Sequence, residues 1–105
     1  MISRFFKPVV QARIAKDIKL AKAMSHPMRL RMCEHIQESP GTNLTMLTKY
    51  IKTFPEHEYV GVNTIHQQLK YLLNAKVVVR ERHGREKKHY INERIVFDYL
   101  NRLGF

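Results

Sequence analysis

The sequence is poor in cysteine, tryptophan, glycine, proline and acidic residues, and these shortages exclude several classes of protein. It has 105 residues with one cysteine, no tryptophan, four glycines and four prolines. The single Cys33 cannot form an internal disulfide, and a structural zinc site needs several cysteines or closely spaced histidines. A chain of this length builds one core, which excludes an enzyme with separate cofactor and substrate domains. We therefore expect one domain over residues 1–105, in a reducing compartment.

Long apolar runs are also missing. Arg4, Lys7 and Pro8 interrupt the only apolar stretch near the start, so it lacks the unbroken core of a signal peptide. No apolar run reaches the length of about 18 residues that indicates a membrane-spanning helix. With 44% hydrophobic residues, the composition is that of a packed globular domain rather than a disordered basic tail. These features predict a soluble, cytoplasmic protein without a membrane partner.

Positive charge is in excess and unevenly spread. The chain has 19 Lys and Arg against 9 Asp and Glu, a formal charge of +10. Residues 1–31 hold eight basic and one acidic side chain, residues 32–62 hold two and four, and residues 76–94 hold seven and three. A basic chain with an acidic middle indicates one face that meets a polyanion, although any single lysine run could be an ordinary solvated surface. The elements that carry the charges decide between these alternatives.

Apolar spacing predicts five helices and one β-hairpin. The first helix should run from Gln11 to Met24, with Ile14, Ile18 and Ala21 on one side. Ser25 is the expected N-cap of a second helix, which carries Met28, Leu30, Met32, Cys33 and Ile36 on an apolar arc and stops at Ser39–Gly41. A third helix is expected from Asn43 or Thr45 to Lys52, and a fourth from Asn63 to Ala75. Two strands follow, at Arg80–Arg82 and Lys87–Ile91, with a turn at His83–Gly84 between them. A last helix begins after its cap, Asn92.

This order of elements is that of a winged helix-turn-helix domain, mainly α with a two-stranded wing. In that fold the fourth helix would lie in the DNA major groove with its N-terminal residues on base edges. Amide side chains suit this role because they can pair with adenine through both N6 and N7. We predict base contacts from Asn63, Thr64, His66 and Gln67, and a phosphate contact from Lys70. Ordinary solvent exposure is the alternative, but a merely solvated helix more often carries Glu and Lys pairs.

The hairpin carries a second basic signal. Five cations, Arg80, Arg82, Arg85, Lys87 and Lys88, surround the turn at Gly84. Protection of an edge strand would explain one or two of them, not five. A wing that follows phosphates or enters the minor groove explains the cluster, so we predict backbone contacts from Arg82, Arg85, Lys87 and Lys88.

Three segments resemble the ArsR family of bacterial winged-helix repressors. AKAMSHPMRLRM, from Ala21, is similar to the family's LKALSDPTRLRIL, and NTIHQQLKYLLNAKVV, from Asn63, resembles its STVSHHLKVLREAGLV. Gly84–Arg85 with His89–Tyr90 resembles the "GR…YY" wing. The resemblance, over about residues 18–92, implies a homodimeric transcriptional repressor whose first and last helices form the interface. Its apolar residues would be Ile14, Ile18, Val96, Phe97, Leu100 and Leu103, unless these stripes pack within one subunit.

The chain departs from the family pattern in two places. Residues 52–62 make a longer turn before the fourth helix, which leaves the angle between the third and fourth helices open. The family's metal sites need a Cys-x-Cys at the third helix or an Asp-x-His near the end; residues 43–50 contain no Cys, and residues 90–105 contain no His. The remaining histidines are dispersed, so we predict no metal, no cofactor and no enzymatic activity. No residue pattern identifies an effector.

Cys33 lies in the apolar arc, which favours a buried, inert thiol over a redox switch, and Arg29 is expected to make a partly buried ion pair or helix-start contact rather than a DNA contact. The competing functions are a protein-association module that docks through Phe54, Tyr59 and Val60, and a binder of structured RNA.

Overall fold

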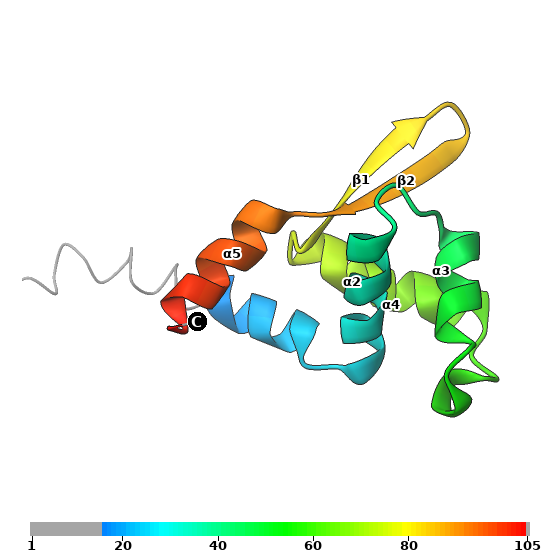
Figure 1. Cartoon of the computed structure of the whole chain (residues 1–105), viewed down its shortest axis with the longest axis horizontal. Coiled ribbons are helices and arrows are strands. Elements are labelled where there is room, and N and C mark those ends of the chain that lie inside the picture. The colour runs from blue at the N-terminus through cyan, green and yellow to red at the C-terminus, as the bar shows by residue number, and fades with distance from the viewer. Residues whose placement is uncertain (1–15, 105) are drawn as a thin grey trace, which may run out of the picture.

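The computed structural model describes residues 16–104, which form helices around one core with a protruding hairpin (Figure 1). The elements are a helical segment over residues 16–24, α2 (Pro27–Glu38), α3 (Leu44–Ile51), the short 3₁₀ helix η1 (Pro55–His57), α4 (Val62–Asn74), β1 (Val78–His83), β2 (Glu86–Ile91) and α5 (Glu93–Arg102). The predicted fold class, five helices and a two-stranded wing in winged helix-turn-helix order, is confirmed. Residues 11–15 of the predicted first helix, Ile14 among them, lie outside the described residues.

The helix starts follow local side-chain chemistry, with one correction. Asn43 Oδ1 accepts from the backbone N–H of Met46 at 2.9 Å and caps α3, and Asn92 caps α5 as predicted. The N-cap of α2 is His26, not Ser25, because His26 Nδ1 accepts from the Met28 N–H at 3.2 Å. Proline forces the residue before it into the extended conformation that an N-cap requires, so Pro27 selects its immediate neighbour.

One apolar core joins the helices to the base of the hairpin. Its fully buried larger members are Leu20, Met32, Ile36, Leu47, Ile51, Ile65, Leu69, Leu72, Val77 and Val78. Of the residues whose spacing predicts the apolar sides of the third and fourth helices, Leu47, Ile51, Ile65, Leu69 and Leu72 are buried, and Leu44 and Leu73 are partly buried against the core. The first helix differs, because Leu20 and Ala23 face the core whereas Ile18 and Ala21 are exposed. Leu30, expected in the apolar arc of α2, is also exposed.

The wing is a regular antiparallel hairpin. The register pairs Val78 with Ile91 at its base and His83 with Glu86 next to the turn. Gly84 has φ +64° at the first position of the two-residue turn, where a side chain would be strained. An isolated antiparallel bridge between Thr42 and His89 ties the wing to the loop before α3 through two backbone hydrogen bonds.

The long turn before α4 is ordered against α2 and α3. The Arg31 guanidinium lies 3.9 Å from the centroid of the Phe54 ring and also pairs with the Glu56 carboxylate. Phe54 meets the Tyr50 ring edge-on at 5.3 Å between centroids. These contacts attach the first half of the turn to α2 and α3.

Candidate nucleic-acid interface

The predicted base-contact residues occupy the solvent side of α4. Ile65, Leu69 and Leu72 are fully buried beneath the helix, which fixes its rotation about its own axis. All of the candidates on the opposite side, Asn63, Thr64, His66, Gln67 and Lys70, are exposed. Asn63, Gln67, Lys70 and Asn74 follow one another at intervals of four and three residues, so they form one line along the helix. Thr64 and His66 lie on opposite flanks of that line.

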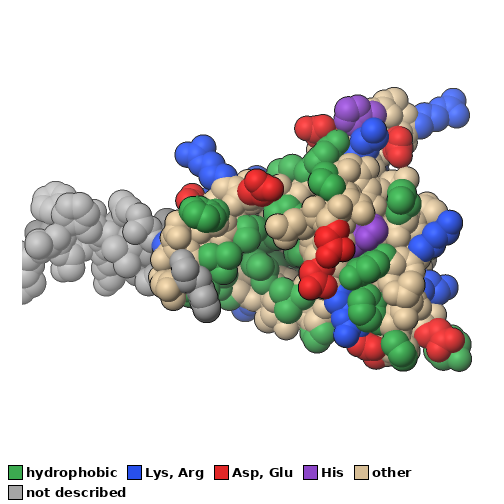
Figure 2. Space-filling model, viewed as in Figure 1, with side chains coloured by type: hydrophobic (Ala, Val, Ile, Leu, Met, Phe, Trp, Pro, Cys, Tyr) green, Lys and Arg blue, Asp and Glu red, His purple; other side chains and the backbone are tan. Residues whose placement is uncertain are grey.

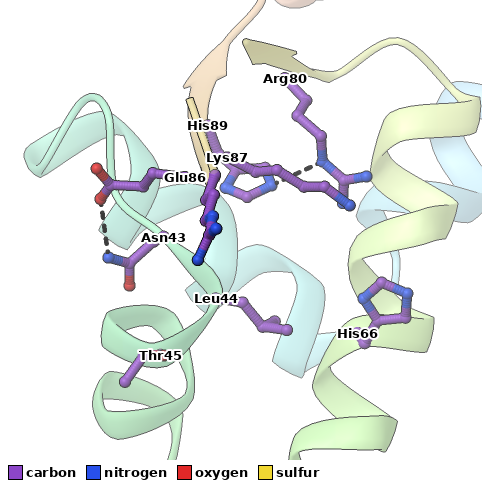
Figure 3. A pocket seen from close by; sticks show the side chains of 9 residues that line it. Asn43, Leu44, Thr45, His66, Arg80, Glu86, Lys87 and His89 are labelled. Atoms are coloured by element: carbon purple, nitrogen blue, oxygen red, sulfur yellow. Dashed lines mark hydrogen bonds between the residues drawn. The ribbon is translucent and has the colours of Figure 1, made fainter. Parts of the chain in front are cut away.

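A groove separates α4 from the start of α3 and the wing (Figure 3). It has a volume of about 300 Å³ and is lined by Asn43, Leu44, Thr45, His66, Arg80, Arg85, Glu86, Lys87 and His89; we call it the wing groove. The structure thus brings together His66, Arg85 and Lys87 from the predicted contact set. Arg80, counted in the basic hairpin but not chosen as a contact, also lines it. The lining residues come from the start of α3, from α4 and from the wing, which are far apart in the sequence. The groove therefore exists only in the folded protein.

The register divides the basic residues of the hairpin between its two faces. Arg82 lies opposite Lys87 and Arg80 lies opposite His89, so these four side chains project from one face. Lys88 lies opposite Glu81 on the other face. Its aliphatic chain comes close to Gly41, since a Cβ added to Gly41 would lie 3.8 Å from the Lys88 Cδ. The predicted set of four wing contacts is therefore not one surface: Lys88 is separated from Arg82 and Lys87.

A buried histidine holds the groove side of the wing in place. His89 is 1% exposed, its Nδ1 donates to the Thr42 carbonyl at 2.9 Å, and its Nε2 accepts from Arg80 Nε at 3.1 Å (Figure 3). Burial lowers the pKa of His89, the hydrogen bond to Thr42 opposes that shift, and the Arg80 and Lys87 cations lower the pKa further. The neutral ring therefore orients Arg80 over the groove. Sequence reasoning could not identify this role of His89, because the acceptor is a backbone carbonyl 47 residues away.

Arg29 joins the first helical segment to α4. Its Nε donates to Gln68 Oε1 at 2.8 Å, and its Nη1 donates to the carbonyls of Lys22 at 2.7 Å and Ala23 at 3.3 Å. The guanidinium also lies 4.4 Å from the centroid of the Tyr71 ring. Among the described residues Arg29 forms no ion pair; of the two expected contacts it makes the one at the helix junction, because it satisfies the carbonyls at the end of the helix before α2.

The predicted dimer residues that the structure describes lie on and beside α5. Ile18 is 49% exposed and Phe97 is 65% exposed, Leu100 and Leu103 are also exposed, and Val96 is half-buried. Figure 2 shows hydrophobic side chains on this part of the surface. Arg102 forms a bidentate pair with Asp17, with Nε at 3.0 Å from each carboxylate oxygen, so α5 and residues 16–24 lie side by side. Among the described residues Phe97, Leu100 and Leu103 stay outside the core, whereas Val96 packs against it. Their part in a dimer interface stays a prediction.

The structure also bears on the Cys33 thiol, the turn before α4, metal sites and membrane-spanning helices. Burial raises the pKa of the Cys33 thiol to about 11, as expected for an inert thiol. Phe54 packs within the protein, whereas Tyr59 is 93% exposed. Among residues 16–104 no group of three His, Cys, Asp or Glu side chains could hold a metal ion. No helix in this part of the chain is both long and apolar enough to cross a bilayer.

The sequence matches no protein-family model and no curated protein. Solved structures do match. The transcriptional repressor PagR of Bacillus anthracis is 27% identical, with a TM-score of 0.68, and the match covers 89% of this chain and 98% of that one. An ArsR-like transcriptional regulator from a Rhodococcus species has a TM-score of 0.73 at 16% identity, covering 89% of this chain and 80% of that one.

A third match is a homodimeric winged helix-turn-helix DNA-binding domain from Mycobacterium bovis, described as a possible ArsR-family regulator. Its TM-score is 0.66 at 14% identity, and the match covers 93% of this chain and 82% of that one. The chain therefore has the winged helix-turn-helix fold of ArsR-family transcriptional regulators, and the resemblance carried by its sequence motifs is confirmed at the level of the fold.

Proposed function

We propose that the protein is an ArsR-family transcriptional regulator that binds double-stranded DNA sequence-specifically, as a homodimer, and represses transcription by occupying a two-fold symmetric operator. One observation carries the proposal: the exposed line of amide and cationic side chains on α4 lies beside a basic groove that ends in the wing. Neutral hydrogen-bonding groups suit base edges, and the flanking cations suit phosphates.

The residues divide into two roles. Asn63, Thr64, His66 and Gln67 contact base edges in the major groove. Lys70, Arg82, Arg85 and Lys87 bind phosphates. Lys88 projects from the far face of the hairpin, so it contributes less to the affinity for the DNA phosphate backbone. Phosphate contacts hold the protein in register without selecting sequence, whereas an amide that pairs with adenine discriminates by about 1–3 kcal/mol.

Dimerisation through residues around Ile18, Phe97 and Leu100 would present two copies of α4 to successive major grooves, about 34 Å apart. The bidentate pair between Asp17 and Arg102 keeps the two contributing helices together within each subunit. Two-fold protein symmetry then requires an operator with inverted half-sites.

The experiment is a selection of bound duplexes from random sequence, followed by fluorescence titration of the selected duplex and an unrelated one at several salt concentrations. Gln67→Ala should lower affinity for the selected duplex by roughly tenfold or more and leave the unrelated one unchanged. Lys87→Ala should weaken both duplexes alike and reduce the salt slope by about 0.9, whereas its neighbour Lys88→Ala serves as the matched control with a smaller loss.

Three results would contradict the proposal. The first is selection that yields no preferred duplex. The second is tighter binding to structured RNA than to duplex DNA in competition. The third is a stoichiometric protein complex that survives nuclease treatment and is lost in Tyr59→Ala, since this would assign the exposed turn to protein association.

A further inference from the structure

A second basic pocket lies on the side of α4 away from the wing groove. It is formed where residues 16–24 end and α2 begins, and it has a volume of about 540 Å³. Its lining residues are Lys19, Lys22, Ala23, Ser25, Arg29, Tyr71 and Asn74. Three of these are cations, and none of the described lining residues is acidic. The wing groove, in contrast, contains Glu86.

Arg29 provides a fixed charge in this pocket. The hydrogen-bond acceptors it uses among the described residues are two backbone carbonyls and an amide oxygen, so no carboxylate neutralises it. Lys19 and Lys22 add two exposed ammonium groups from successive turns of the helical segment over residues 16–24. Tyr71 and Asn74 supply polar groups from α4. This combination of cations and neutral donors is suited to an anion with several oxygens, such as a phosphate.

The pocket is continuous with the proposed base-contact surface. Asn74 both lines the pocket and ends the exposed line that begins at Asn63. His66, which lines the wing groove, and Tyr71, which lines the pocket, are five residues apart and therefore about 140° apart around the helix. The polar line of α4 thus runs between two basic hollows, one on each flank.

We propose that the pocket formed by Lys19, Lys22 and Arg29 binds a phosphodiester of the DNA backbone on the side of α4 opposite the wing. This rests on the proposed function, because a helix placed in the major groove, about 12 Å wide, has a phosphate backbone on both sides. The wing groove faces one backbone and this pocket faces the other. Three of the eight basic residues within residues 1–31 thereby acquire a ligand.

The test compares two double variants that remove the same charge. Lys19→Gln with Lys22→Gln alters the pocket, and Lys49→Gln with Lys52→Gln alters exposed residues at the end of α3 that line neither hollow. Affinity for the selected and unrelated duplexes is measured by fluorescence anisotropy at two salt concentrations, and folding is checked by circular dichroism. Arg29 is left intact because it also holds two helices together.

The pocket variant should bind both duplexes more weakly and keep the sequence preference of the parent. Loss of two phosphate contacts lowers the salt slope by about 1.8, so its deficit should be about sevenfold larger at about 0.1 M than at about 0.3 M salt. The α3 variant should keep nearly the parental slope. An equal slope in the two variants, or a parental slope in the pocket variant, would overturn the assignment.

Free inorganic phosphate has the same charged oxygens as a DNA phosphodiester, so a separate measurement must distinguish the two ligands. If millimolar inorganic phosphate raises the melting temperature of the parent but not of the pocket variant, and duplex binding is unchanged, the pocket serves a small anion and the DNA assignment is wrong. A parent that binds no duplex would refute both proposals, whereas a parent that binds DNA with an unaltered pocket variant would refute this one alone.

Discussion

His89 permits a prediction in which two similar substitutions separate stability from DNA binding. Its two ring nitrogens have different partners, the Thr42 carbonyl at Nδ1 and the Arg80 guanidinium at Nε2. In His89→Asn the amide nitrogen stands near the Nδ1 position and can still donate to Thr42. In His89→Gln the carboxamide reaches the Nε2 position and can still accept from Arg80. Each variant therefore keeps one of the two contacts.

The magnitude follows from burial and hydrogen bonding. His89→Ala removes a side chain that is 1% exposed and its bond to Thr42. A net hydrogen bond contributes about 1 kcal/mol and burial of the ring about 2 kcal/mol, so we expect the free energy of unfolding to fall by about 3 kcal/mol. His89→Asn should recover about 1 kcal/mol of that loss. His89→Gln should be less stable than His89→Asn, yet bind duplex DNA more tightly, because Arg80 lines the wing groove and an oriented Arg80 adds to the positive charge there, although no phosphate contact of its own is assigned to it.

The pH dependence gives an independent check on the same residue. Burial lowers the pKa of His89 below its ordinary 6.5, so the unfolded chain takes up a proton before the folded protein does. The stability is complete above that ordinary value and is lost as pH falls through it, by at most about 1.4 kcal/mol per pH unit. All three His89 variants should lose this component, because each lacks the titrating ring. The lowered pKa of His35, also caused by burial, leaves a background common to all variants.

The assay is urea denaturation followed by circular dichroism at neutral pH and again at about one unit below the ordinary histidine pKa. A pH-induced loss of stability in His89→Asn equal to that of the parent would show that another group titrates. Equal DNA affinity in the asparagine and glutamine variants would show that Arg80 needs no orientation by His89. Either result would refute the argument for a neutral, orienting ring.

Three further predictions concern the proposed dimer interface, a helix cap and the Cys33 thiol. Leu100→Glu should convert a homodimer into a folded monomer, because it places a charge in the apolar interface. Light scattering after gel filtration would measure the molar mass, and a variant that stays dimeric would exclude this interface. Asn43→Ala should lower the free energy of unfolding by about 1 kcal/mol through loss of the α3 cap, and Asn43→Ser should restore most of it, so equal stability of the two variants would count against the cap. The pKa of Cys33, raised from 9.0 to about 11, should make its reaction with a thiol reagent near pH 8 about 100-fold slower than that of an unperturbed cysteine, whereas fast labelling without denaturant would contradict its burial.

Much of the fold could be predicted because periodicity is a local property. The buried residues of α3 and α4 recur every three or four positions, and the caps Asn43 and Asn92 stand directly before the helices they start. Errors arose where two neighbouring residues competed for one role. Pro27 selected His26 over Ser25 as a cap, and core packing selected Leu20 over Ile18 as the inward side of the first helix.

The candidate interface could be predicted only in part, because helix faces follow local spacing whereas strand register and distant partners do not. The exposed line of α4 follows from its buried side, so Asn63, Gln67 and Lys70 could be placed on one surface. Which wing cations share a face depends on strand register, and register separated Lys88 from Lys87. The partners of Arg29 and Arg80 could not be foreseen, because neutral acceptors distant in the sequence leave no charge pattern to detect.

By itself the sequence determined the order of the helices, the polar character of α4, the basic wing and the excess positive charge. Those features depend on residue type and short-range spacing, which folding does not alter. The tertiary structure decided where the charges meet. It placed Lys19 and Lys22 beside the end of α4 and the wing cations on its other flank, because the rotation of each helix is fixed by the side chains it buries in the shared core.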